Sequence, residues 1–250
     1  MRVAAIYDIH GNLPALDAVL HDILQQDVDL IIVGGDVLPG PMPQETMARL
    51  LDLDVPARFI HGNGDRVVLA HTRGEPIDEV PPQYRESISW TASRLDRPTR
   101  RALAAWPPTC TLEIGGLGDV LFCHATASND VECFTRLTPD NRVTSLFAGV
   151  TASMVVCGHT HMQFDRTVDS RRFVNAGSVG APFAPPRGAH WLLLGPDVQL
   201  RQTPYDVDRA AEQMRATGFP LVEDVAIRYV VNPPAESESL AMFSHADTQP

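Results

Sequence analysis

Long apolar runs are missing from this sequence, and cysteine is scarce. No run approaches the roughly 20 apolar residues that a membrane span needs. The apolar start of the chain ends at Asp8, too early for a signal peptide. The cysteines form no C-x-x-C pair, in a chain too large to need disulfide staples, and they are Cys110, Cys123, Cys133 and Cys157. We therefore expect free thiols in a reducing compartment, the cytoplasm.

Basic residues are also few. The 20 basic residues, all of them arginine, face 31 aspartates and glutamates, which gives a formal net charge of −11. This balance argues against a protein that binds nucleic acid nonspecifically or lies on an anionic membrane. The hydrophobic fraction of 44% is ordinary for soluble proteins, so the chain can bury a core.

Strands and helices alternate in the first part of the chain. Short apolar runs that end at polar residues or glycine predict buried strands at residues 3–7, 30–33, 57–60, 120–123 and 154–157. Amphipathic or well-capped segments predict helices at residues 13–26, 43–51, 82–95, 97–106, 139–147 and 207–216. Asn12 fits the N-cap of the first helix. The alternation predicts an α/β fold.

The pattern changes after residue 160. Short stretches separated by turn residues predict antiparallel strands at 164–168, 172–174, 190–194 and 198–203, and hence a second or mixed sheet. We interpret residues 1–232 as a single domain and the polar residues 233–250 as a flexible or loosely docked tail. The aromatic residues Tyr84, Trp90 and Trp106 fit helix packing better than a substrate wall.

Metal-capable side chains follow each of the five predicted buried strands. In chain order they are Asp8 and His10, then Asp36, Asn63 and His124, and finally His159 and His161. Ligands of open α/β sheets bind at the carboxyl ends of the strands, so five segments can deliver these groups to one place. Seven groups exceed what one ordinary metal ion needs, and mixed nitrogen and oxygen donors suit transition metals. The pattern predicts a two-metal site bridged by Asp36.

The order of these blocks resembles a known family. The blocks Asp8-Ile9-His10, Gly35-Asp36, Gly62-Asn63, His124 and Gly158-His159-Thr160-His161 are similar to the signature blocks of the calcineurin-like metallophosphoesterases. The run Asn175-Ala176-Gly177-Ser178-Val179-Gly180 resembles the Asn-Pro-Gly-Ser loop of that family's small bacterial and archaeal phosphodiesterases. The resemblance implies an α/β fold, a four-layer α/β/β/α sandwich with two mixed β-sheets.

The resemblance also implies how the metals are held. One metal takes Asp8, His10, Asp36 and His161, and the other takes Asp36, Asn63, His124 and His159. The implied cofactors are two divalent transition-metal ions, Mn before Fe, Zn, Ni or Co. Such a pair can hold a hydroxide and neutralise phosphoryl oxygens during in-line displacement, which makes water the nucleophile.

The chain departs from the family at residue 64. The family's run Gly-Asn-His-Asp reads Gly62-Asn63-Gly64-Asp65 here. The missing histidine ordinarily contacts the phosphate and is the candidate leaving-group acid, a role worth roughly 10²–10⁴-fold in rate. His61 can replace it only if its ring faces the site, and Asp65 is expected to orient its neighbours. We assign catalytic roles to Asp36, Asn63 and Asp65.

These features favour a metal-dependent phosphoesterase that hydrolyses a phosphodiester. A phosphomonoesterase or a dinucleoside polyphosphate hydrolase is an alternative, because the same metal pair can attack several phosphoryl groups. A second alternative is a binding or scaffold protein that kept the fold and lost efficient chemistry. Gly64, where the family has a histidine, supports this alternative. The expected partner is a small phosphate ester or a nucleotide, with no membrane and no long nucleic acid. A small homo-oligomer is expected only because such assemblies are common.

Overall fold

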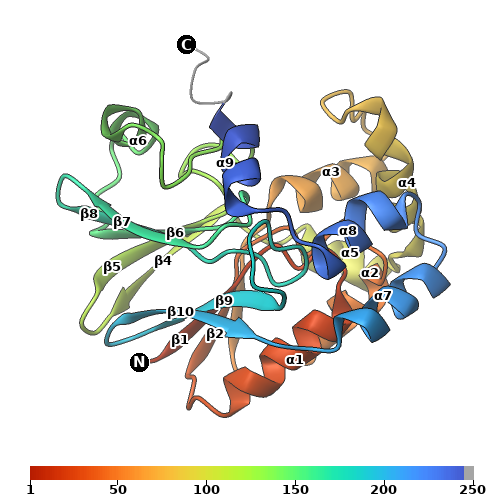
Figure 1. Ribbon diagram of the computed structural model, residues 1–250, viewed down its shortest axis with the longest axis horizontal. Coiled ribbons are helices and arrows are strands. Elements are labelled where there is room, and N and C mark those ends of the chain that lie inside the picture. The colour runs from red at the N-terminus through yellow and green to blue at the C-terminus, as the bar shows by residue number, and fades with distance from the viewer. Residues whose placement is uncertain (245–250) are drawn as a thin grey trace.

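Two five-stranded β-sheets lie face to face in the computed structural model, which describes residues 1–244 (Figure 1). The first sheet has the order β10-β9-β1-β2-β3. Its parallel strands are β1 (Val3–Ile6), β2 (Leu30–Val33) and β3 (Ala57–Phe59). Strand β9 (Ala189–Leu194) runs antiparallel to both β1 and β10 (Val198–Thr203). The sheet is therefore mixed.

The second sheet has the order β4-β5-β6-β8-β7 and is also mixed. Strands β5 (Gly118–Cys123), β6 (Met154–Cys157) and β8 (Arg171–Asn175) run parallel to one another. Strands β4 (Thr109–Ile114) and β7 (Phe164–Val168) pair antiparallel at the two edges. The antiparallel strands predicted after residue 160 thus divide between the two sheets.

Helices cover the outer faces of the sheets (Figure 1). Those that pack on the first sheet are α1 (Leu13–Leu24), α2 (Pro43–Leu51), α3 (Asn63–Thr72), α4 (Arg85–Arg94) and α5 (Arg97–Leu103). On the second sheet lies α6 (Asp140–Leu146). The later helices are α7 (Val207–Ala216), the π-helical turn η2 (Glu223–Ile227), α8 (Arg228–Val231) and α9 (Glu236–Ser244). A 3₁₀ turn, η1 (Pro82–Tyr84), precedes α4.

Alternation along β1 explains why the strand reads as continuously apolar. Val3 and Ala5 face the second sheet, whereas Ala4 and Ile6 face the helices, and all four are fully buried. A strand that is covered on both faces has no solvent side on which to place polar residues. The two sheets and their helical covers confirm the predicted four-layer fold with two mixed sheets.

The structure also contains elements that the pattern did not predict. These are β4, α3 and the turn-like helices η2 and α8. Asn12 caps α1 as predicted, because its side-chain oxygen accepts from the backbone N–H of Ala15 at 3.2 Å. No helix within the described residues is long and apolar enough to cross a membrane.

Half of the segment interpreted as a polar tail, residues 236–244, is a docked helix. In α9, the Ser239 hydroxyl donates to the backbone oxygen of Phe183 at 2.7 Å, and Leu240 is buried. Arg136 forms an ion pair with Glu236 at 2.9 Å. Residues 245–250 of the predicted tail lie outside the described residues. The division into a domain at 1–232 and a tail stays a prediction.

Candidate metal centre

The seven predicted ligand residues lie directly beyond strand ends, and both sheets contribute. The first sheet supplies Asp8 and His10 after β1, Asp36 after β2, and Asn63 as the first residue of α3 after β3. The second sheet supplies His124 after β5, and His159 and His161 after β6. The structure brings these side chains into two adjacent clusters. Their roles as ligands stay a prediction.

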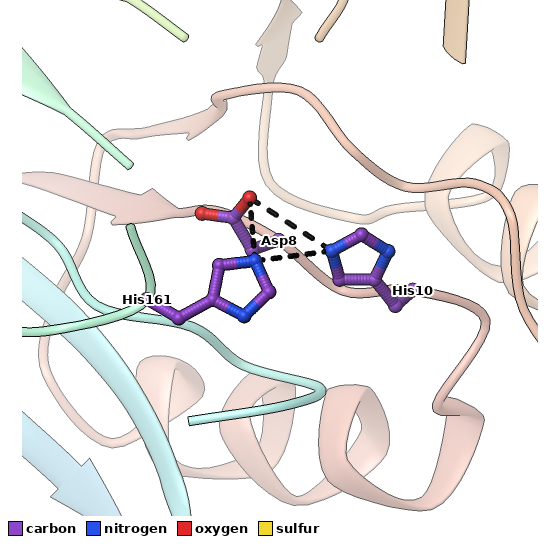
Figure 2. Close-up of side chains that lie close together, drawn as sticks. All are labelled: Asp8, His10 and His161. Carbon is purple, nitrogen blue, oxygen red and sulfur yellow. Dashed lines mark hydrogen bonds and ion pairs between the residues drawn. The ribbon is translucent and has the colours of Figure 1, made fainter. Parts of the chain in front are cut away.

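The first cluster consists of Asp8, His10 and His161 (Figure 2). Nε2 of His10 lies 3.2 Å from Nε2 of His161, which in turn lies 3.3 Å from Oδ1 of Asp8. This Asp8 oxygen is buried and accepts no hydrogen bond. The other carboxylate oxygen accepts from the backbone N–H of His159 at 2.9 Å. One carboxylate oxygen is thus held by the backbone, and the other is left for a cation.

The second cluster consists of Asp36, His124 and His159, and Asn63 adjoins it. One end of the Asn63 amide lies 3.2 Å from Nε2 of His124 and 3.1 Å from Nδ1 of His159. An amide oxygen at this end faces only acceptors, which is the environment of an oxygen that binds a cation. Oδ2 of Asp36 lies 3.4 Å from Nε2 of His124 and 3.9 Å from Nε2 of His10, so this carboxylate lies between the clusters.

Backbone carbonyls fix the tautomers of the clustered histidines. Nδ1 faces a carbonyl in three of them: Pro39 for His10 at 3.3 Å, Gly34 for His124 at 3.1 Å and Ala181 for His161 at 2.7 Å. In His159 it is Nε2 that faces a carbonyl, that of Val131, at 3.1 Å. A carbonyl only accepts, so each of these nitrogens is the donor and the opposite nitrogen is left to face the clusters. Metal-binding histidines are characteristically oriented in this way.

The backbone is strained at the same residues. Eight non-glycine residues within the described part of the chain have positive φ. Five of them belong to the clusters: Asp8, His10, Asp36, His159 and His161. Such conformations cost of order 1–3 kcal/mol each and concentrate at functional sites. These backbone conformations therefore lower local stability and orient the five side chains toward the clusters.

The carboxylates draw positive charge to the centre. Burial alone would lower the pKa of His124, but the Asp36 and Asp8 carboxylates outweigh it and raise that pKa to about 10. Burial lowers the pKa of His159 to about 4, so its ring is neutral near pH 7. The carboxylates that hold a proton on His124 would also favour a divalent cation in place of that proton, because an imidazole binds a metal only after it loses the proton. The donor set therefore fits two metals.

Asp65 lies behind the centre rather than in it. Its two carboxylate oxygens accept from the backbone N–H groups of Leu38 at 3.0 Å and Gly62 at 3.1 Å. Burial and the nearby Asp36 charge raise the pKa of Asp65 to about 7. The side chain connects the loop after β2 to the start of α3, which orients Asp36 and Asn63. The sequence predicts a catalytic role for Asp65. We propose that this role is to position Asp36 and Asn63.

Gly64 is packed too closely to accept a side chain. Its N–H donates to Oδ1 of Asp36 at 2.7 Å. A Cβ at this position would lie 2.3 Å from the backbone oxygen of Leu38 and 2.9 Å from Cδ of Pro39. The loop of residues 38–39 thus fills the space next to residue 64.

His61 belongs to neither cluster within the described residues.

The loop of residues 175–180 supports the ligands from behind. The Ser178 hydroxyl donates to the backbone oxygen of Asp8 at 2.7 Å. Asn175 Nδ2 donates to the backbone oxygen of Gly158 at 2.6 Å, at the start of the turn that carries His159 and His161. The buried cysteines Cys123 and Cys157 lie outside both clusters and pack in the core.

Several groups at the centre had no signal in the sequence. The carbonyls of Gly34, Pro39, Val131 and Ala181 act through the backbone, so side-chain identity does not reveal them. Phe183, whose ring centroid lies 4.4 Å from that of His161, belongs to a proline-rich loop that composition alone could have marked. Tyr84, interpreted as a helix-packing residue, is 45% exposed and lines a cavity beside the centre.

The fold and the two clusters define the class of protein: an α/β sandwich with paired Asp and His groups at the carboxyl ends of its strands. Residues 1–194 match the calcineurin-like phosphoesterase superfamily domain. Since this match spans well over half of the chain, the protein belongs to that superfamily. The resemblance carried by the motifs is confirmed.

Relatives extend the similarity beyond the matched domain. An uncharacterized protein of Methanocaldococcus jannaschii, MJ0912, is 27% identical in an alignment of 237 residues that covers 87% of this chain and 93% of the relative. A metallophosphoesterase from Sphaerobacter thermophilus has the same fold, with a TM-score of 0.71, 24% identity and coverage of 92% and 99% of the two chains. A hypothetical protein from Pyrococcus horikoshii, PH1004, aligns with a TM-score of 0.76, 19% identity and coverage of 88% and 94%.

Proposed function

We propose that this protein is a metal-dependent phosphodiesterase. The observation that carries the proposal is the set of nitrogen and oxygen donors in the two clusters. Four imidazoles, each oriented by a backbone carbonyl, turn their second nitrogen toward the carboxylates of Asp8 and Asp36 or the amide of Asn63. Imidazole nitrogens and carboxylate oxygens packed this closely form a donor set for divalent cations.

We propose the same division of the residues between two metals that the sequence predicts. Asp8, His10, Asp36 and His161 would hold one, and Asp36, Asn63, His124 and His159 would hold the other. When bound, a metal pair acidifies water and neutralises charge on phosphoryl oxygens. Mn²⁺ is the proposed activator, because carboxylate oxygens join imidazoles in both sets and the Asn63 amide joins the second.

The chain's own groups hold Asp36 in place for this role. Its Oδ1 accepts from the Gly64 N–H, so the carboxylate is fixed at the start of α3 while Oδ2 faces the histidines. Asp65 fixes the same helix start through Gly62. Preorganisation of this kind removes a reorganisation cost from the reaction.

Gly64 supports a diester over a monoester as the substrate. A monoester carries one more negative charge on its phosphoryl oxygens, and the family's additional imidazole donor is absent at this position. A Cβ at Gly64 would lie 2.3 Å from the Leu38 backbone oxygen, so a side chain here could restore that donor only if the backbone moved. A diester with a good leaving group needs less help from a proton donor.

The test uses the full chain loaded with Mn²⁺ and bis-(p-nitrophenyl) phosphate. We expect Asp36→Asn and His124→Ala to lower kcat/KM by about 100-fold or more, because several kcal/mol of charge stabilisation depend on the metals. His21→Ala is the matched control, because His21 is exposed on α1 away from the clusters. Equal rates for the parent and the two cluster variants would refute the proposal.

A substrate panel separates the remaining activities. Rates on p-nitrophenyl phosphate and on a dinucleoside polyphosphate, measured beside the diester, are expected to be lower. A faster monoester or polyphosphate reaction would replace the diesterase assignment. If the protein is a scaffold, we expect no bound metal and no turnover. Against this alternative, every predicted ligand position retains a side chain that can bind a metal.

A further inference from the structure

A cavity of about 590 Å³ adjoins the first metal cluster. His10 and His161 form its inner wall, and Gln83, Tyr84 and Ile88 line it from η1 and α4. Its volume falls within the range of about 300–1,000 Å³ that is typical of small-molecule sites. Because the predicted ligands His10 and His161 line the cavity, an ester group bound there can belong to the same molecule as a phosphate held at the metals.

The outer wall comes from a part of the chain beyond the matched superfamily domain. That domain ends at residue 194. The wall is built by Met214, Phe219, Leu221, Ala226 and Tyr229, between the end of α7 and α8. These residues are apolar or aromatic. The part of the chain outside the matched domain thus contributes an apolar wall to the cavity.

An aromatic path leads from the metal cluster into the cavity. The Phe183 ring centroid lies 4.4 Å from that of His161 and 4.6 Å from that of Tyr229. All three residues line the cavity. Aromatic walls of this kind favour a planar ring, which gains from stacked or edge contacts as well as from burial.

The charge of the cavity disfavours a second anionic group. Apart from the predicted ligands His10 and His161, the described lining residues include one carboxylate, Asp224, and one guanidinium, Arg228, whose charges cancel. A polyphosphate would place further negative charge here without a cluster of cations to receive it. An uncharged ring meets no such cost.

We infer that the cavity binds an uncharged aromatic ester group of a phosphodiester, with the phosphate at the metal clusters. The inference rests on the proposed phosphodiesterase function and names its substrate class. Either a nucleoside or a simpler aryl alcohol supplies such a ring.

The test compares diesters that share a p-nitrophenyl leaving group and a single negative charge. Phenyl p-nitrophenyl phosphate should have a kcat/KM on the order of tenfold or more above that of methyl p-nitrophenyl phosphate, because only the phenyl group removes a ring-sized apolar area from water. The p-nitrophenyl ester of thymidine 5′-phosphate is the third substrate. A rate above that of the phenyl ester assigns a nucleoside, and a lower rate assigns a simpler aryl group.

Two matched variants separate the cavity from the intrinsic reactivity of the esters. Leu221 lines the cavity and is 42% exposed, whereas Leu200 lies on β10 outside it and is 45% exposed. Leu221→Trp should fill the cavity and lower the phenyl-to-methyl ratio at least fivefold, whereas Leu200→Trp should leave it unchanged. Tyr84→Ala, at a partly exposed lining residue, should also lower the ratio.

The outcomes distinguish failure of the inference from failure of the function. Turnover of both esters with a ratio near one, or the same ratio in the Leu221 and Leu200 variants, overturns the inference and leaves the phosphodiesterase assignment standing. If neither ester turns over, calorimetric titration with diphenyl phosphate and dimethyl phosphate decides. Tighter binding of the diphenyl ester that Leu221→Trp abolishes supports the cavity assignment, and equal or absent binding of the two refutes it.

Discussion

Single residues at the centre are positioned by backbone groups and at the expense of local stability. Asp8, His10, Asp36, His159 and His161 all have a left-handed backbone. Their orientation is completed by hydrogen bonds such as that from His161 Nδ1 to the Ala181 carbonyl at 2.7 Å. Strain that persists in a folded chain requires compensation from its surroundings. At this centre, compensation comes from the loops behind the ligands and, we propose, from metal binding.

Gly64 provides the first prediction at the residue scale. A Cβ here would lie 2.3 Å from the Leu38 carbonyl oxygen, a backbone atom that cannot swing away. Gly64→Ala should therefore lower the free energy of unfolding by about 1–3 kcal/mol and reduce phosphodiesterase activity through Asp36. Gly64→His should likewise lose activity instead of restoring the family's histidine. Urea denaturation and the diester assay measure the two effects.

Gly115 is the matched control for this glycine. No atom lies within 4 Å of a Cβ built at Gly115, so Gly115→Ala should change the free energy of unfolding by no more than about 0.5 kcal/mol. Equal stability of the two alanine variants would show that residue 64 has room for a side chain. Higher activity of Gly64→His would lead to the same conclusion.

His190 provides a prediction about pH. Burial lowers the pKa of this ring below the unfolded value of 6.5. Between these two pKa values the unfolded chain binds more protons than the folded one, so stability is present above pH 6.5 and falls as the pH drops. From pH 7.5 to 5.5, the parent should lose more unfolding free energy than His190→Gln. Every other histidine is common to the two proteins, so identical pH slopes would contradict the assignment.

The sequence predicted the ligand residues but not their supports. Asp8 and His161 could be predicted because a polar residue directly after a buried strand has a defined place in an α/β fold. The carbonyl partners Pro39 and Val131 could not, because any residue supplies a carbonyl and long-range folding decides which one arrives. The consequence of Gly64 was predictable only in part: the sequence showed a missing imidazole, and the structure adds that its space is filled.

At the scale of elements, strands buried on both faces were the easiest to predict. β1 and β6 read as uninterrupted apolar runs because all of their residues are buried. Strand β4 is an edge strand with exposed polar residues, so its run Thr-Cys-Thr-Leu-Glu-Ile gives a weaker signal. Helix α3 begins within the Gly62-Asn63 motif and contains a glycine and two adjacent valines, which weaken a helical prediction.

Helix α9 provides the prediction at the element scale. Leu240 is 7% exposed, whereas Met242 on the same helix is 53% exposed. If α9 docks as described, Leu240→Ala should cost about 2–5 kcal/mol of unfolding free energy, and Met242→Ala should cost less than about 0.5 kcal/mol. Thermal or urea unfolding compares the two. Equal, small effects would contradict the docked helix and favour the loosely docked tail that the composition predicts for residues 236–244.

At the scale of the whole molecule, the centre joins the two sheets. The first cluster combines Asp8 and His10 from beyond β1 with His161 from beyond β6 (Figures 1 and 2). Strand positions predicted this meeting, because parallel strands present their carboxyl ends at one edge. The cavity was not predictable, since its lining comes from segments as distant as Tyr84 and Tyr229 and no local pattern places them together.

The most direct measurement is the anomalous scattering of crystals grown with Mn²⁺. We predict two peaks about 3.5–4 Å apart. One should lie among Asp8, His10 and His161, and the other among Asp36, Asn63, His124 and His159. Crystals that show no peak at these side chains, or manganese bound only elsewhere on the chain, would contradict the account.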